Sequence, residues 1–209
     1  GSVTVNATTA INNIEYNLLG TSAEGSFTIT SDKDANIVLN NLNLSNPNGP
    51  AFQSLSAAIT TITLRNGTNN TLADGTANTK NGTIQTGGTL IFDGMGSLSV
   101  DGVKKHAIYS SKRIEMLNGK ITINTAVSDA FHSEGFTIAN GSVNVLNTGG
   151  DGIDAGDGNI TITGGNIDIQ STAVDVKAIK TGLGAVNIHG GMIKLDVSGA
   201  ASKGISAKG

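Results

Sequence analysis

Short runs of strictly alternating apolar and polar residues recur through the second half of the chain. Five of them follow directly on a glycine, with the sequences Ser-Leu-Ser-Val, Lys-Ile-Thr-Ile, Ser-Val-Asn-Val, Asn-Ile-Asp-Ile and Met-Ile-Lys-Leu. The glycines, spaced by 23, 22, 24 and 26 residues, are Gly96, Gly119, Gly141, Gly165 and Gly191. Alternation with period two predicts β-strands with one inward and one outward face, and no helical spacing competes with it.

Each repeat contains two further short strands. One precedes the glycine, as in Ile114–Met116, and the other begins some ten to twelve residues after a glycine, as in His106–Ile108. Three strands per coil of 22–26 residues predict an all-β, parallel β-helix whose coils stack about 4.8 Å apart. The alignment predicts one inward apolar column that includes Phe52, Ile84, Ile108 and Phe131.

The N-terminal part of the chain is less regular. Phe27–Thr30, Ile37–Leu39 and Ile59–Leu64 have the pattern of strands, and Gly1-Ser2 resembles the remnant of a cleaved tag. We expect residues 1–35 to form a capping region and residues 36–209 a parallel β-helix domain. No linker or break in composition separates a second domain, so we expect a single domain overall.

Composition excludes several classes of function. With no Cys, the chain has no disulfide framework, zinc ribbon or thiol nucleophile. A net charge of −3 and only two Arg, Arg65 and Arg113, argue against nucleic-acid binding. No apolar run reaches the roughly 18–20 residues that a membrane span needs. The absence of Trp and the presence of only two Tyr favour ligand binding through charged groups over binding through a broad aromatic platform.

Acidic residues concentrate between positions 129 and 175. Asp129 and Asp151 occupy the same column one coil apart, and such neighbouring carboxylates repel unless something neutralises them. A Ca²⁺ ion, which takes six to eight oxygen ligands, is one answer, with Asp154, Asp157 and Asp175 completing the shell. The alternative interpretation is that these residues are ordinary solvated turn residues, because Asp bonds readily to its own backbone in turns.

The same column continues through His106, Lys177 and Lys203. It therefore predicts a mixed acidic and basic stripe up one face of the coil. We count His106, His132, Tyr109, Glu134, Lys177 and Lys203 as candidate ligand-binding residues. Two interpretations stay open for the stripe: it binds the carboxylates of uronates, or it is a charge-alternating ladder that discourages strand mispairing.

Several stretches resemble a known family. They are residues 36–44, residues 62–75, the Ile-Thr-Gly-Gly-Asn-Ile-Asp-Ile run at 162–169, and the Asp-Gly-Ile and Lys-Gly-Ile steps. The chain resembles bacterial secreted carbohydrate-binding domain-containing proteins, built as right-handed parallel β-helices related in fold to pectate lyases. The resemblance implies binding of a plant cell-wall polysaccharide, cellulose or pectin, with calcium on the helix. It also implies a secreted or cell-surface protein, and we expect a monomer.

Three functions remain to be separated. The resemblance favours non-catalytic polysaccharide binding. A pectate-type lyase needs a base beside a bound uronate, for which Lys177 or Lys180 is the candidate, and paired-carboxylate hydrolysis would use Asp129 and Asp151. A structural or adhesive cell-surface solenoid is the third alternative.

Overall fold

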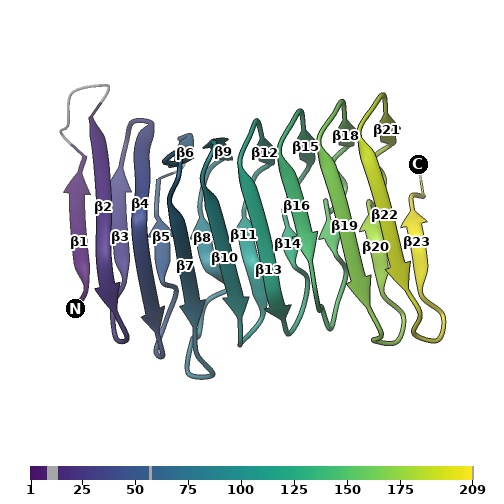
Figure 1. Cartoon of the computed structure of the whole chain (residues 1–209), viewed down its shortest axis with the longest axis horizontal. Coiled ribbons are helices and arrows are strands. Elements are labelled where there is room, and N and C mark those ends of the chain that lie inside the picture. The colour runs from purple at the N-terminus through teal and green to yellow at the C-terminus, as the bar shows by residue number, and fades with distance from the viewer. Residues whose placement is uncertain (9–13, 57, 209) are drawn as a thin grey trace.

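The computed structural model describes residues 1–8, 14–56 and 58–208. The described residues form 23 strands and no helix, and the strands stack as a parallel β-solenoid of about eight turns. Figure 1 shows the strands side by side along the long axis, with the two termini at opposite ends. The described residues contain no helix long and apolar enough to cross a membrane. The predicted fold class is confirmed.

One parallel ladder, here called the first ladder, forms a nine-stranded sheet. Its inward column is the one predicted from the sequence, since Phe52, Ile84, Ile108 and Phe131 pair in register on successive coils. The strands are β1 (Val3–Ala7), β3 (Phe27–Ser31), β5 (Phe52–Ser54), β8 (Gly82–Thr86), β11 (His106–Ser110), β14 (Phe131–His132), β17 (Ile153–Asp154), β20 (Lys177–Lys180) and β23 (Lys203–Ser206).

The other two ladders belong to one fourteen-stranded sheet and meet at a corner. The second ladder contains β6 (Thr60–Leu64), β9 (Leu90–Gly94), β12 (Ile114–Met116), β15 (Phe136–Ile138), β18 (Ile160–Ile162) and β21 (Val186–Ile188). The third ladder contains β7 (Asn69–Asp74), β10 (Ser97–Gly102), β13 (Lys120–Ala126), β16 (Ser142–Val145), β19 (Asn166–Ser171) and β22 (Met192–Val197). The long strand β4 (Ala35–Asn46) bends around the corner and pairs with both β6 and β7.

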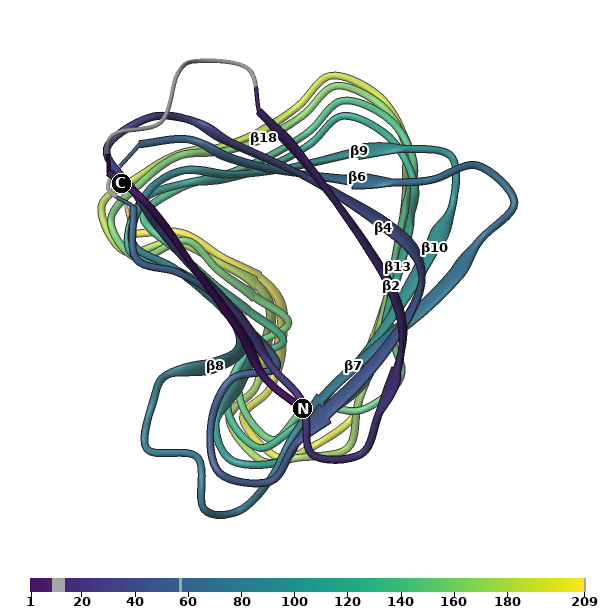
Figure 2. The same ribbon diagram turned by 90° about the vertical axis from the view of Figure 1, so that its left-hand side faces the viewer.

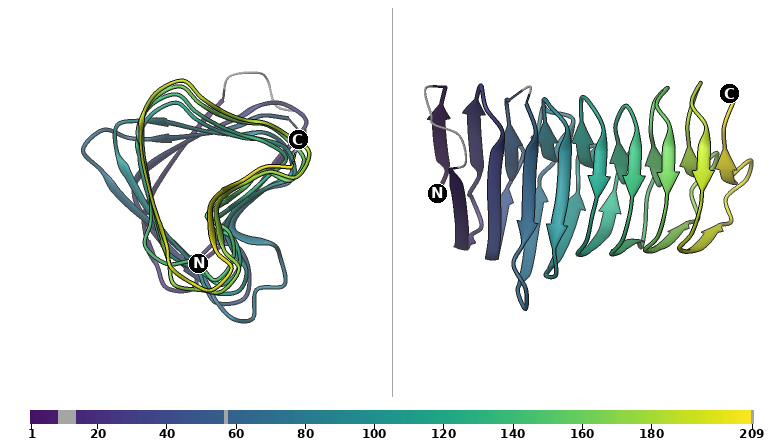
Figure 3. Two further views of the ribbon diagram at one scale, coloured as in Figure 1. Left: turned by 90° about the vertical axis from the view of Figure 1, so that its right-hand side faces the viewer. Right: turned by 90° about the horizontal axis from the view of Figure 1, so that it is seen from above.

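The described part of the predicted capping region continues these ladders. β1 pairs with β3, with Val3 opposite Phe27, and β2 (Glu15–Ser22) pairs with β4, with Tyr16 opposite Ile37. Residues 1–35 therefore supply the first coil and the start of the next, with residues 9–13 lying outside the described part. Figures 2 and 3 show the later coils nearly superimposed down the axis, whereas the earlier coils diverge from them and carry projecting loops; the first ladder bends inward only in the later coils.

The core consists of inward apolar columns from all three ladders. Ile, Leu and Val supply most of it, but all five Phe are buried in it as well. Phe27 stacks on Phe52 with ring centroids 5.7 Å apart, and Phe131 meets Phe136 edge-on at 5.5 Å. Each fully buried large apolar side chain contributes about 1.5–3 kcal/mol, so the columns stabilise the inner coils, whereas the strands of the last coil, β21 to β23, are only partly buried.

The corner between the second and third ladders explains the spacing of the glycines. Gly119, Gly141, Gly165 and Gly191 have positive φ there, a conformation that L-residues with a side chain rarely adopt. In the coil before them, the positive φ falls on Gly94 and not on the aligned Gly96. A Cβ atom on Gly141 would also lie 2.5 Å from the carbonyl oxygen of Gly119 on the coil below. Glycine is therefore required at this corner both by the backbone conformation of the turn and by the close approach of neighbouring coils.

Candidate functional site

Charged and aromatic side chains gather on the outward surface of the later coils of the first ladder. Tyr109, His132, Asp154 and Lys180 stand opposite one another on four consecutive strands, β11, β14, β17 and β20. Three residues earlier on their own coils lie His106, Asp129, Asp151 and Lys177. We call His106, Tyr109, Asp129, His132, Asp151, Asp154 and Lys180 the acid–base cluster.

Asp129 lies at the centre of one half of this cluster and is buried. Its Oδ1 accepts a hydrogen bond from the backbone N–H of Asp151 at 2.8 Å, and its Oδ2 lies 2.9 Å from Nδ1 of His132. Nδ1 of His106 lies 3.2 Å from Oδ2 but also 3.3 Å from the backbone N–H of Asp129 itself. One Nδ1 cannot serve both as donor and as acceptor in the neutral ring.

The protonation states follow from burial. His106 is only 4% exposed, and this burial lowers its pKa despite the nearby Asp129. We therefore assign a neutral His106 that accepts from the N–H of Asp129. The hydrogen bond to Asp129 raises the pKa of His132, so His132 is the donor. Burial by itself would raise the pKa of the Asp129 carboxyl, but the hydrogen bonds that it accepts from His132 and from the backbone N–H of Asp151 hold that pKa below its ordinary value.

The other half of the cluster centres on Lys180. Its Nζ lies 2.9 Å from a carboxylate oxygen of Asp151 and 2.9 Å from one of Asp154. Partial burial opposes the charge on Lys180, yet these two carboxylates raise its pKa above the ordinary value. The remaining carboxylate oxygens accept from backbone N–H groups, that of Lys177 at 2.7 Å and that of Gly156 at 3.0 Å. Among the described residues, no buried side-chain polar atom lacks a hydrogen-bond partner.

These contacts bear directly on the calcium hypothesis. One carboxylate oxygen from each of Asp129, Asp151 and Asp154 lies within 4.8 Å of the others, which is the hard oxygen set that Ca²⁺ takes. However, Lys180 already pairs with Asp151 and Asp154, and His132 contacts Asp129. The repulsion that suggested an ion is therefore partly offset by side chains of the protein itself, and an ion at this place would have to displace the ammonium group of Lys180.

The other two predicted metal ligands lie apart from this set. Asp157 is exposed, and its Oδ1 accepts from the backbone N–H of Leu183 at 3.1 Å. Asp175 is exposed, has a positive φ of 61°, and pairs with Lys177 at 2.7 Å. Both behave as the turn residues of the alternative interpretation, so the structure does not bring the full predicted shell of five carboxylates together.

The predicted ligand-binding residues divide in the same way. His106, Tyr109 and His132 come together with their rings stacked, with centroids 4.4 Å apart between the two His and 5.7 Å between Tyr109 and His132. Three others stand outside the cluster. Lys177 faces Asp175, Lys203 is exposed on the last strand of the ladder, and Glu134 is exposed beside Gly156.

Lys180 was absent from the predicted binding residues, although it appeared as a candidate lyase base. A signal for it existed in the sequence. The chemistry-bearing residues occur in pairs three positions apart on four successive coils: His106 and Tyr109, Asp129 and His132, Asp151 and Asp154, Lys177 and Lys180. Aligning the second residue of each pair, as well as the first, places Lys180 next to Asp154.

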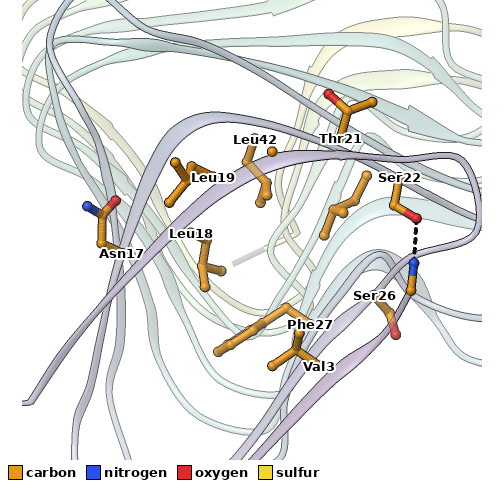
Figure 4. A pocket seen from close by; sticks show the side chains of 12 residues that line it. Val3, Asn17, Leu18, Leu19, Thr21, Ser22, Ser26, Phe27 and Leu42 are labelled. Atoms are coloured by element: carbon orange, nitrogen blue, oxygen red, sulfur yellow. Dashed lines mark hydrogen bonds between the residues drawn. The ribbon is translucent and has the colours of Figure 1, made fainter.

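An apolar hollow of about 310 Å³ lies far from this cluster, at the N-terminal end of the solenoid. Figure 4 shows Val3, Leu18 and Phe27 facing its interior, with the Gly1 ammonium donating to Oγ of Ser22 at 2.7 Å. It is the space between the first coils where the stacked core ends. Apart from the Gly1 ammonium, no charged group lines it, so we place the candidate site at the acid–base cluster.

Comparison with known proteins agrees with the fold and with the resemblance noted in the sequence. The model of the carbohydrate-binding domain-containing family matches residues 1–209, so the chain belongs to that family. A solved structure described as the polysaccharide lyase-like protein from C. thermocellum, a gadolinium derivative, superimposes with a TM-score of 0.76. The two chains share 22% identity over 96% of this chain and 87% of the other. No curated protein sequence matches this chain.

Proposed function

We propose that this protein binds a linear polysaccharide along the outward row of the acid–base cluster, without cleaving it. The observation that carries the proposal is the row itself. Tyr109, His132, Asp154 and Lys180 lie on consecutive coils, so a ring, an imidazole and an ammonium group face outward along one row, with the buried carboxylate of Asp154 between the last two. An extended sugar chain lying along the solenoid axis meets these groups in succession.

The cluster is suited to binding because it is rigid. Asp129 and Asp151 are buried beneath the outward row and hold His132 and Lys180 through short contacts. Little side-chain entropy is then lost when a ligand binds, which favours affinity. The stacked Tyr109 and His132 offer a small ring surface for a pyranose, and membership in a carbohydrate-binding family supports this class of ligand.

The charges of the acid–base cluster determine how it binds neutral and acidic polysaccharides. Three carboxylates, Asp129, Asp151 and Asp154, face only Lys180 and His132 within the cluster. A uronate carboxylate would add a further negative charge, so an acidic chain of the pectin type needs an added cation here. We therefore propose ion-independent binding of a neutral β-glucan of the cellulose type, and calcium-assisted binding of polyuronate at this cluster, with Ca²⁺ displacing Lys180.

A pectate-type lyase is the second candidate, and the protonation of the cluster speaks against it. A general base must be unprotonated near the working pH. The pKa of Lys180 is raised by its two carboxylates, so Lys180 is a poor base. Incubation with pectate and calcium should give no rise in unsaturated-uronide absorbance, and such a rise would overturn the non-catalytic form of the proposal.

Affinity electrophoresis tests the binding itself. We expect wild-type protein to be retarded in gels containing a soluble cellulose derivative, equally with EDTA and with Ca²⁺. Tyr109→Ala should lose most of the retardation, because stacking on an aromatic ring contributes about 1 kcal/mol or more. Thr161→Ala, a matched change on the outward face of the second ladder, should behave as wild type. Equal retardation of all three proteins would exclude the cluster as the binding face.

A further inference from the structure

A shallow groove follows the corner between the second and third ladders. Figure 2 shows this corner on the opposite side of the coil from the first ladder, whose strands carry the acid–base cluster. The groove consists of three adjoining hollows of about 290, 360 and 360 Å³. Met95 and Gly96 line the first two, Ser142 and Asn166 line the last two, and Lys120 lines all three. We call this continuous depression, from Gly67 to Lys194, the corner groove.

Backbone stacking explains the floor of this groove, but not its walls. Corner glycines such as Gly141 are required because a Cβ would meet the coil below. The polar side chains along the edges have no such necessity. Ser97, Lys120, Ser142 and Asn166 stand opposite one another on β10, β13, β16 and β19, and so present hydroxyl, ammonium, hydroxyl and amide groups at one strand spacing.

Amide groups on the other edge are oriented by a chain of hydrogen bonds. Nδ2 of Asn118 donates to Oδ1 of Asp93 at 3.0 Å, and Nδ2 of Asn140 donates to Oδ1 of Asn118 at 3.1 Å. The carboxylate of Asp93 thus sets the direction of both amides. Within the described part of the chain, Oδ1 of Asn140 and the second N–H of each amide have no further partner, which leaves them for a ligand rich in hydroxyl groups.

Lys120 gives the groove its charge. The side chain is exposed and forms no ion pair with any described residue, whereas Lys194 at the far end is paired with Asp168. Met95 and Met192, 78% and 72% exposed, add apolar surface near the two ends. An acidic, hydroxyl-rich, elongated ligand matches all of these features: carboxylate for Lys120, hydroxyl groups for the two polar edges, and sugar ring faces for the methionines.

We propose that the corner groove is a second binding site, which takes a polyuronate chain along the solenoid axis without a metal ion. This inference extends the proposed function, in which the acid–base cluster binds neutral chains. Because the two sites lie on opposite sides of one rigid solenoid, a single molecule then bridges a neutral and an acidic polysaccharide.

Affinity electrophoresis in polygalacturonate with EDTA tests the groove. EDTA removes the calcium-assisted route at the acid–base cluster. We expect wild-type protein to be retarded, and Lys120→Gln to bind about two- to fivefold more weakly at low salt, the range of an exposed charge pair. Lys112→Gln removes the same charge from an exposed position outside the groove and should bind as wild type. Asn140→Ala should weaken binding further when added to Lys120→Gln.

Two results would overturn the proposal: equal retardation of wild type and Lys120→Gln, or equal losses for Lys120→Gln and Lys112→Gln, which would indicate only unspecific charge attraction.

Bridging has its own readout, since wild-type protein should carry soluble polygalacturonate onto insoluble cellulose in EDTA. Lys120→Gln should bind the cellulose but leave the polyuronate in solution. Tyr109→Ala should do the reverse, staying with polyuronate off the cellulose. If nothing binds cellulose while Lys120 still controls polyuronate retardation, the proposed function fails and the groove stands.

Discussion

The acid–base cluster and the corner groove present side chains at the same spacing but use charge in opposite ways. In the cluster, Asp129, Asp151 and Asp154 are buried and bound to Lys180, to His132 or to backbone N–H groups. In the groove, Lys120 is exposed and unpaired among the described residues. A parallel ladder fixes the distance between neighbouring side chains. Burial then decides whether a charge holds the fold together or is available to a ligand.

The largest expected effect is the loss of a buried carboxylate. Asp151→Ala leaves the N–H of Lys177 without its partner and removes half of the charge that faces Lys180. We expect the free energy of unfolding to fall by about 2–3 kcal/mol. This loss is smaller than that for breaking a fully buried ion pair, because Lys180 is partly exposed. Chemical denaturation measures this change.

The control for this prediction comes from the other region. Lys120→Ala removes an exposed charge with no ion-pair partner among the described residues, so the free energy of unfolding should change by no more than about 0.5 kcal/mol. Equal destabilisation by Asp151→Ala and Lys120→Ala would contradict the distinction between structural and available charge.

The next effect concerns calcium. Lys180→Ala leaves three neighbouring carboxylates that face only His132, and these form the oxygen set that suits Ca²⁺. We expect the variant to melt at a lower temperature than wild type in EDTA and to be stabilised by millimolar Ca²⁺. Wild type should respond less, because the ion must first displace an ammonium group.

Differential scanning calorimetry with and without Ca²⁺ makes this comparison. If calcium raises the melting temperature of wild type as much as that of Lys180→Ala, then Lys180 does not occupy the position of the ion. No calcium response in either protein would remove the cluster as a metal site altogether.

The smallest expected effect is the pH dependence of stability, to which His132 and His106 contribute with opposite signs. The pKa of His132 is raised in the folded state by its bond to Asp129, so its contribution is complete below the ordinary pKa of about 6.5 and disappears as pH rises through the folded value. The pKa of His106 is lowered by burial, so protonation in the unfolded chain costs stability as pH falls below about 6.5.

Urea denaturation of His132→Gln and His106→Gln between pH 5 and pH 8.5 resolves the two contributions. His132→Gln should lose more stability, relative to wild type, at the acidic end than at the alkaline end. His106→Gln should show the opposite trend. Parallel curves for the two variants would contradict the opposite directions of the pKa shifts of His106 and His132.

Much of the architecture could be predicted because a parallel solenoid places one residue per coil in each column. The alignment put Phe52, Ile84, Ile108 and Phe131 together, and they stack. It erred by two residues at one corner, where positive φ falls on Gly94 and not on Gly96. That corner contains one extra residue, since Phe92 pairs with Met116 and Leu98 with Ile121. A spacing averaged over the repeat does not reveal such an insertion.

The sequence by itself determined the solenoid, its columns, and the neighbouring positions of His106, Asp129, Asp151 and Lys177, because period-two alternation and the repeat length are local properties. Only the tertiary structure decided which carboxylates meet. The turns direct Asp157 and Asp175 away, and Lys180 reaches Asp154 from the next coil. The corner groove likewise depends on contacts between coils. Side-chain direction in a turn, and burial by a neighbouring coil, are set by backbone conformation and packing across the stack, which a linear pattern does not encode.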